Sequence, residues 1–275
     1  MAEKVAIFNE RKRKMKYKKL LLIFVLCIVA LFTFSCKSEG ESKAEKKEIT
    51  VLAAASLTDV CNEIKDVYEK KEKVKINFSY GSSGALQSQI EEGVNADCYM
   101  SAAMAQMNTL VDKGLVKRNS VVKLLENKVV LIVPKSSNKD IKSFKDLDTD
   151  KVKIVGIGEP NSVPAGKYAK QVLTSLNIWD KVRKKGNFGT DVRTVLSWVE
   201  MREVDCGVVY ETDAKISHKV KIVDTATDKM CDKVIYPAGI LSKTNKDKDA
   251  RAFMKFLQSD DAIKIFKKYG FYEVK

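Results

Sequence analysis

Four positions where a strand-like segment gives way to a helical one carry hydrogen-bond donors without charge. These positions are Ser56, Ser83, Ala165 and Val192. The start of a helix offers backbone N–H groups that lack intrahelical acceptors, together with partial positive charge, so it attracts anions. Several such starts facing one space would suit a compact, fully ionised oxyanion. Taken singly, each serine is better explained as an ordinary helix cap, worth about 1 kcal/mol.

Motifs for enzymatic chemistry are incomplete in this sequence. It has no Gly-x-x-x-x-Gly-Lys-Ser/Thr phosphate loop, and residues 156–161 have Asn where a dinucleotide fingerprint has its third Gly. Residues 81–85 approach a Gly-x-Ser-x-Gly nucleophile elbow. The single histidine, His218, lies in a polar stretch and is expected on an exposed loop. We therefore expect no enzyme, and a hydrolase with Ser83 as its nucleophile is the alternative.

The segments that must position these residues alternate between strand and helix from residue 49 onward. Apolar runs predict strands, and apolar residues three or four apart predict helices. Strands are expected at 49–54, 74–78, 97–101, 128–134, 152–157, 206–210 and 234–241, with a turn at 80–84. Helices are expected from 55 onward, around 86–90 and 104–111, at 165–176, at 191–201 and across 247–269. This alternation indicates an α/β protein with largely parallel sheets.

Two extended segments, near 128–134 and 234–241, bracket the middle of the chain. A chain that crosses out and crosses back makes two lobes with a cleft between them. We expect lobe 1 to comprise 49–128 plus 237–275, and lobe 2 to comprise 129–236.

Five motifs in a fixed order resemble those of a known family. They occupy 53–58 (Ala-Ala-Ala-Ser-Leu-Thr), 81–84 (Gly-Ser-Ser-Gly), 163–169, 190–193 and 207–210. With the closing segment at 266–271, they make residues 49–275 resemble the molybdate-binding proteins of ABC importers. The resemblance implies a type II periplasmic-binding-protein-like fold, α/β and two-lobed, with the ligand cleft between the lobes.

The resemblance also implies capture of molybdate or tungstate, with no cofactor and no bare metal cation. By motif, Ser56 and Ser83 would each offer a hydroxyl and a backbone N–H. Ala165 and Val192 would offer backbone N–H groups, and Tyr210 a phenolic O–H. A carrier of another oxyanion, such as sulfate, is the alternative within the binding class. For Tyr210, the alternative is a plain core residue of its strand.

The neighbours of these residues are given other roles. Ser83 is favoured over Ser82 from its spacing to the helix. Asp191 is expected to cap its helix, because a carboxylate in the site would repel an anion. Arg193 and Lys167 are expected to point outward.

The first 48 residues have the composition of an export signal and a tether. A cationic run at 11–19 precedes an apolar run at 20–34, which is short for a bilayer-spanning helix. Residues 1–35 resemble a bacterial lipoprotein signal peptide, with Cys36 as the lipidated first residue of the mature protein. Residues 37–48 contain no apolar residue larger than Ala, so a flexible tether is expected over 36–48.

We therefore expect an extracytoplasmic monomer, lipid-anchored at the cell surface or in the periplasm, that works with an ABC importer permease. An uncleaved or cleaved anchor with Cys36 as an ordinary thiol is the alternative. The sequence leaves open whether translation starts at Met1 or Met15.

The charge of the chain first suggests a nucleic-acid partner. Its 275 residues include 50 Lys and Arg and 36 Asp and Glu, a formal net charge of +14. Residues 1–35 hold eight of those basic residues against two Glu, so much of the excess belongs to the export signal. No nucleic-acid partner is expected, and a protein that binds polyanions through its basic surface alone is a further alternative.

Four cysteines belong to the part of the chain expected to fold. They are Cys61, Cys98, Cys206 and Cys231. Their wide spacing, without a Cys-x-x-Cys pair, favours free thiols that behave as small apolar residues, although a disulfide stays open.

Overall fold

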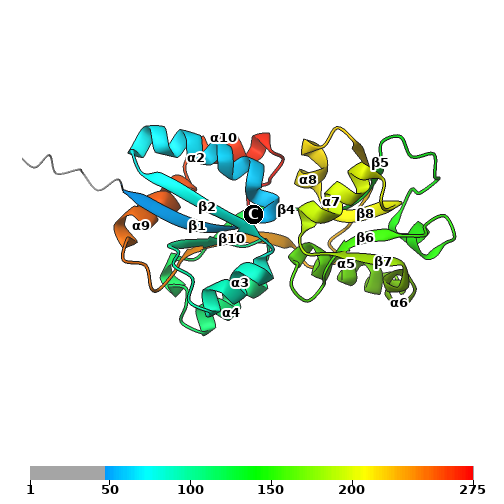
Figure 1. Cartoon of the computed structure of the whole chain (residues 1–275), viewed down its shortest axis with the longest axis horizontal. Coiled ribbons are helices and arrows are strands. Elements are labelled where there is room, and N and C mark those ends of the chain that lie inside the picture. The colour runs from blue at the N-terminus through cyan, green and yellow to red at the C-terminus, as the bar shows by residue number, and fades with distance from the viewer. Residues whose placement is uncertain (1–46, 275) are drawn as a thin grey trace, which may run out of the picture. The chain divides into compact units, whose positions relative to one another are not determined.

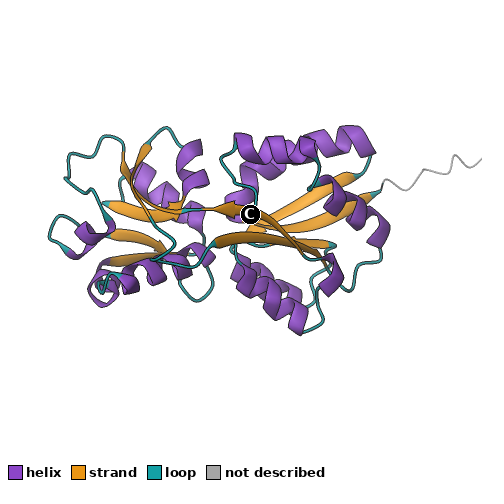
Figure 2. Ribbon diagram, turned by 180° about the vertical axis from the view of Figure 1, so that it is seen from behind, coloured by secondary structure: helices purple, strands orange, loops and turns teal. Residues whose placement is uncertain are grey.

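A computed structural model describes residues 47–274, and these residues form two five-stranded sheets joined by extended segments (Figure 1). The strand orders are β2-β1-β3-β10-β4 and β7-β6-β8-β5-β9. Helices lie on both faces of each sheet in the two opposite views (Figures 1 and 2). We call the first sheet with its helices lobe 1 and the second sheet with its helices lobe 2.

Lobe 1 is built around a buried parallel strand. Its strands are β1 (Glu48–Ala54), β2 (Lys75–Gly81), β3 (Cys98–Met100), β4 (Val122–Asn127) and β10 (Val234–Ile240). Its helices are α2 (Thr58–Glu72), α3 (Ser83–Glu91), α4 (Met104–Asp112), α9 (Asp247–Phe256) and α10 (Asp260–Lys268). The first strand pairs in parallel with β2 and β3 and is buried continuously from Val51 to Ala54, as expected for a strand covered on both faces.

Lobe 2 repeats this plan. Its strands are β5 (Val129–Pro134), β6 (Val155–Gly158), β7 (Gly186–Gly189), β8 (Cys206–Tyr210) and β9 (Val220–Thr225). Its helices are α5 (Pro164–Ser175), α6 (Trp179–Val182), α7 (Val192–Met201) and α8 (Glu211–Ile216). Short 3-10 helices complete the chain at η1 (Ala55–Leu57), η2 (Arg118–Ser120), η3 (Phe144–Asp148) and η4 (Arg183–Lys185).

The chain passes between the sheets in two places. It leaves lobe 1 directly from β4 into β5 through Lys128, and it returns from β9 to β10 through residues 226–233. Asn127, the last residue of β4, is buried, and its Oδ1 accepts a hydrogen bond of 2.8 Å from the Lys128 backbone N–H. The return strand joins the first sheet along its whole length, beginning with Val234 beside Asn127.

Several expectations need correction. The sheets are mixed, because β10 runs antiparallel to β3 and β4, and β5 runs antiparallel to β8 and β9. The strand β4 was not predicted, since its exposed and half-buried positions lack a clear apolar run. The expected turn at 80–84 is confined to Ser82, between β2 and α3. The closing region is two helices, separated where Ser259 caps α10 through a hydrogen bond from Ala262 N.

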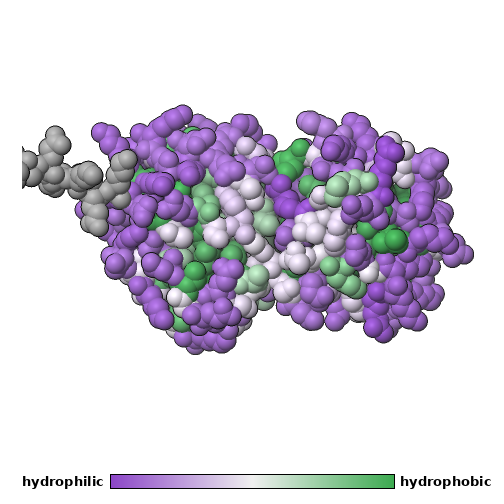
Figure 3. Space-filling model, in the orientation of Figure 1, coloured by the Kyte–Doolittle hydropathy of each residue, from purple (hydrophilic) through white to green (hydrophobic). Residues whose placement is uncertain are grey.

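On the face shown in Figure 3, the outer surface of both lobes is mostly hydrophilic. Residues of intermediate hydropathy gather where the lobes meet, which is where the small residues of the strand-to-helix junctions lie.

Candidate anion-binding site

A small cavity lies where the strand-to-helix junctions of both lobes converge. Its lining residues are Ala54, Ala55, Ser56, Gly81, Ser82, Ser83, Ala102, Val163, Pro164, Ala165, Asp191, Val192 and Tyr210. The space between them is about 200 Å³, including the part open to solvent. Pockets for drug-sized ligands have volumes of about 300–1,000 Å³, so this smaller cavity suits a much smaller ligand. All five residues singled out from the sequence as anion donors line it.

Ser56 reaches the cavity because β1 ends at Ala54 and a single 3-10 turn, η1, leads into α2. Its side chain makes no capping hydrogen bond at this helix start. Instead, its Oγ lies 2.9 Å from the hydroxyl oxygen of Tyr236 on β10, and the residue is buried. The hydroxyl is therefore held by the core of the protein and is not used by the helix.

Ser83 is the first residue of α3 and is completely buried. Its Oγ accepts a hydrogen bond of 2.9 Å from Ala102 N, and its carbonyl accepts one of 2.8 Å from the Tyr99 hydroxyl. The neighbouring Ser82 is the N-cap of α3 and accepts a hydrogen bond from Ala85 N. This division of roles supports the choice of Ser83, although both serines line the cavity.

Lobe 2 contributes two helix starts. Ala165 is the second residue of α5, after Pro164, and Val192 is the first residue of α7. Backbone N–H groups in the first turn of a helix have no intrahelical acceptor. Asp191 caps α7, as expected, by accepting hydrogen bonds of 2.7 and 2.9 Å from the backbone N–H groups of Arg193 and Thr194.

Tyr210 ends β8 and is 1% exposed. Its hydroxyl is buried and has no hydrogen-bond partner among the described residues. Burial raises its pKa well above the usual value, so the hydroxyl keeps its proton. Because an unpaired buried hydroxyl is unfavourable by about 1–3 kcal/mol, its place on the cavity wall points to a missing acceptor.

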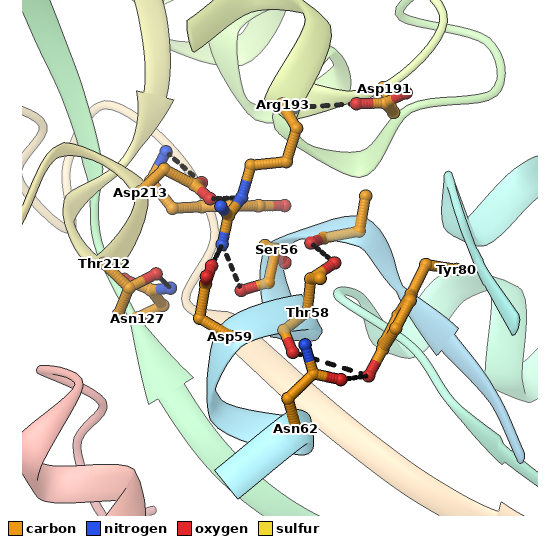
Figure 4. Close-up of polar contacts among 12 residues, drawn as sticks. Ser56, Thr58, Asp59, Asn62, Tyr80, Asn127, Asp191, Arg193, Thr212 and Asp213 are labelled. Atoms are coloured by element: carbon orange, nitrogen blue, oxygen red, sulfur yellow. Dashed lines mark hydrogen bonds and ion pairs between the residues drawn. The ribbon is translucent and has the colours of Figure 1, made fainter. Parts of the chain in front are cut away.

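Arg193 does not point outward, as the sequence suggested, but joins the two lobes. Its Nη2 donates to Asp59 Oδ2 of lobe 1 at 2.6 Å and lies 3.5 Å from the Ser56 carbonyl oxygen. Its Nε lies 2.7 Å from Oδ1 of Asp213, a fully buried residue of α8. We call Arg193, Asp59 and Asp213 the ion cluster, which Figure 4 shows around the guanidinium group.

The ion cluster is not part of the cavity wall, and its guanidinium is balanced by two carboxylates. Burial raises the pKa of Asp213 to about 6, and the neighbouring Arg193 opposes that rise. Sequence reasoning missed Asp59 and Asp213, because their role depends on how the lobes meet and no local spacing reveals it.

A second contact between the lobes passes through a glycine. Gly84 N of α3 donates a hydrogen bond of 2.9 Å to Ser162 O, just before α5. A Cβ at Gly84 would lie 2.3 Å from that carbonyl oxygen, so only glycine permits this approach. The lobes therefore touch on the rim of the cavity.

The other residues that the sequence singled out for possible chemistry lie away from the cavity. Lys167 and His218 are exposed, as expected. The cysteines of residues 47–274 are free thiols, and those at 61, 98 and 206 are buried. In the same range no cluster of potential metal ligands occurs, and no helix is long and apolar enough to cross a membrane. The predicted signal peptide, tether and Cys36 lie outside the described residues.

Comparison with known proteins adds an independent line of observation. A family model for bacterial extracellular solute-binding proteins matches residues 49–272. A Bacillus subtilis protein provisionally named as the ABC transporter substrate-binding lipoprotein YvgL is 44% identical, over 90% of this chain and 96% of its own length. The molybdate-binding protein ModA of Haemophilus influenzae is 39% identical, over 84% of this chain and 92% of its own length.

A solved structure shows the same architecture. It is the substrate binding domain of a provisionally named molybdenum ABC transporter from Clostridium difficile, with a TM-score of 0.65 and 38% sequence identity. The match covers 83% of this chain and 99% of that structure. The predicted α/β fold of the periplasmic binding proteins is thereby confirmed.

Proposed function

The chain belongs to the bacterial extracellular solute-binding proteins, a non-enzymatic family that serves transporters, and on that premise we propose that it captures molybdate or tungstate between its two lobes. The ligands would be the hydroxyl and backbone groups of Ser56 and Ser83, the backbone N–H groups of Ala165 and Val192, and the Tyr210 hydroxyl. We also propose that the boundaries between the two lobes lie where the chain crosses, near residues 128 and 236.

The observation that carries the proposal is a cavity whose donors are neutral, with the buried Tyr210 hydroxyl unpaired among the described residues. None of the described residues that line it is Lys or Arg. Hydrogen bonds to a charged partner are worth about 1.5–3 kcal/mol each, so several convergent donors could hold a dianion without a cationic side chain. Enclosure between lobes strengthens such bonds by excluding water.

Calorimetric titration with molybdate, tungstate, sulfate and phosphate tests the proposal. We expect one saturable site, with molybdate or tungstate bound much more tightly than sulfate or phosphate. Equal binding of all four anions, or none, would contradict it. A clear preference for sulfate would instead support the alternative oxyanion carrier.

Replacement of the two serines tests the assigned ligands. Ser56→Ala and Ser83→Ala should each weaken molybdate binding about 10- to 150-fold, the value of one hydrogen bond to a charged group. Ser259→Ala is the matched control, because it removes a hydroxyl that caps α10. If the control weakens binding as strongly as the site variants, the hydroxyls are not ligands.

We further propose that Cys36 is lipidated and that the tethered protein delivers its anion to an ABC permease. A relative at 44% identity carries the word lipoprotein in its name, which supports this part of the proposal. Incorporation of labelled fatty acid into the wild-type chain, and its loss in Cys36→Ser, is the expected result. Equal labelling of both chains would contradict lipidation at this residue.

A further inference from the structure

The hydroxyl oxygens of the two site serines each lie within hydrogen-bond distance of a buried protein group. For Ser83 the donor is a backbone N–H, that of Ala102, at 2.9 Å. A backbone N–H cannot act as an acceptor, so the Ser83 hydroxyl hydrogen must be donated elsewhere. The corresponding partner of Ser56 is the Tyr236 hydroxyl at 2.9 Å, and either of these two groups could donate.

The amide of Asn127 resolves which of the two hydroxyls donates. Its Oδ1 accepts from the Lys128 N–H at 2.8 Å, and this fixes the orientation of the amide, since a backbone N–H can only donate. The amide nitrogen Nδ2 therefore faces the other way. It donates to Thr212 Oγ1 at 2.9 Å and to the Tyr236 hydroxyl at 3.3 Å.

Tyr236 thus accepts from Asn127 and keeps one proton of its own. The residue is 1% exposed, and among residues 47–274 Ser56 Oγ, at 2.9 Å, is the acceptor placed in hydrogen-bond geometry. Burial raises the pKa of Tyr236 well above the usual value, so this proton is retained. Donation to Ser56 leaves the hydrogen of Ser56 free to point into the cavity.

We propose that Tyr236, oriented by Asn127, is a positioning residue that makes Ser56 an obligate hydrogen-bond donor. As a result, the site rejects oxyanions that carry a proton. This inference rests on the proposed function. We call this series of hydrogen bonds the relay. It runs from the Lys128 backbone N–H through the Asn127 amide and the Tyr236 hydroxyl to Ser56. It links β4, the last strand before the chain leaves lobe 1, to β10, the strand on which the chain returns.

The acidic residue of the cavity wall is engaged by its own helix. Asp191 is the acidic lining residue, and its carboxylate accepts from Arg193 N, Thr194 N and Thr194 Oγ1. A fully ionised oxyanion presents only acceptors to such a wall. A protonated oxyanion would bring an O–H group that meets only donors at Ser56 and Ser83, an arrangement that loses a hydrogen bond.

Sulfate and phosphate make a suitable pair of probes. Both are tetrahedral anions, but at neutral pH sulfate is fully ionised whereas inorganic phosphate keeps at least one proton. In the full-length protein, displacement of molybdate by each anion gives a ratio of the two inhibition constants. Tyr236→Phe should lower the preference for sulfate over phosphate about tenfold, because Ser56 could then rotate and accept a hydrogen bond. Molybdate affinity should fall by a similar factor.

Tyr99→Phe is the matched control. It also removes a buried tyrosine hydroxyl that contacts a site serine. That hydroxyl donates to the Ser83 carbonyl and does not fix the direction in which a serine O–H group points. The sulfate-to-phosphate ratio should stay at the wild-type value in this variant. An unchanged ratio in Tyr236→Phe, or an equal change in both variants, would overturn the proposal.

If Tyr236→Phe does not fold, Asn127→Asp carries the test, with thermal unfolding as the check on folding. This change places an acceptor where Nδ2 now donates, which would draw the Tyr236 proton away from Ser56. The same loss of sulfate preference is expected, and a wild-type ratio would overturn the proposal. If the wild-type protein bound no molybdate, the proposed function would fail, and this is distinct from a failure of the relay.

Discussion

The cavity and the ion cluster are separated by a single step along α7, yet they are built from opposite electrostatics. Val192 lines the cavity, where the inward groups are neutral donors. The next residue, Arg193, turns toward Asp59 and Asp213, where every group can carry charge (Figure 4). The contrast suggests a division of labour, in which neutral groups recognise the anion and charged groups hold the lobes together.

This division has a physical reason. A cationic side chain in the cavity would attract many anions, whereas fixed neutral donors discriminate by size and protonation. An ion pair between the lobes adds little to recognition but can favour the closed arrangement of the lobes, in which water is excluded. The following predictions test that separation, beginning with the largest expected effect.

Gly84→Ala should abolish closure without unfolding the protein. The added methyl group would lie 2.3 Å from the Ser162 carbonyl oxygen of the opposite lobe. Without the donors of lobe 2, molybdate affinity should fall by more than about 1,000-fold, the value of several lost hydrogen bonds. Titration and small-angle scattering measure affinity and closure.

Ser88→Ala, at an exposed position of the same helix, is the control for this change and should bind normally. Near-normal binding by Gly84→Ala would show that the close approach of the lobes is not needed.

Arg193→Met should lower the free energy of unfolding by about 3–5 kcal/mol, since it leaves the fully buried Asp213 without its partner. The loss should shrink as the pH falls toward 6 and level off below it. Burial raises the pKa of Asp213 to about 6 even beside Arg193, so without that cation the acid is protonated at a higher pH and needs no partner. Chemical denaturation across this pH range is the measurement. Adding Asp213→Asn should restore most of the stability, and a double variant as unstable as the single one would contradict the account.

Tyr210→Phe should weaken molybdate binding about 10- to 150-fold and leave stability nearly unchanged, because its hydroxyl has no hydrogen-bond partner within residues 47–274. Tyr68→Phe provides a close comparison, since its hydroxyl is also buried and unpaired among residues 47–274 but lies in the core of lobe 1 away from the cavity. Titration of both variants distinguishes a ligand from an ordinary core tyrosine. Equal effects on binding would remove Tyr210 from the ligand set.

Asp59→Asn should have the smallest effect, a loss of affinity of up to about fivefold. Asp59 is partly exposed, and such ion pairs contribute about 0.2–1 kcal/mol. Asp66→Asn makes the same charge change on an exposed part of α2 and should bind normally. If Asp59→Asn weakened binding as much as Tyr210→Phe, the ion cluster would take part in anion recognition. That result would contradict the separation of recognition from lobe contact.

The sequence indicated the residues of the cavity better than those of the ion cluster. Ser56, Ser83, Ala165 and Val192 could be found because helix starts have local signals, and the cavity does gather them. Arg193, Asp59 and Asp213 could not be found, because their pairing joins residues 134 positions apart in one case and depends on how the lobes meet.

The fold shows the same limit. Strongly apolar strands such as β5 and β8 were predicted closely, because burial on both faces leaves a continuous apolar run. The antiparallel pairing of β10 was missed, since strand direction within a sheet follows from chain crossings and has no local pattern. Tyr236, which lies on that strand, was missed for the same reason.

The most direct test of the central claim is titration of the full-length protein with molybdate at low and at high salt. Neutral donors in an enclosed cavity predict one saturable site whose affinity changes little with ionic strength, because no exposed cation is involved. A steep loss of affinity with salt, or the absence of a saturable site, would show that anions bind to the basic surface and would contradict the account.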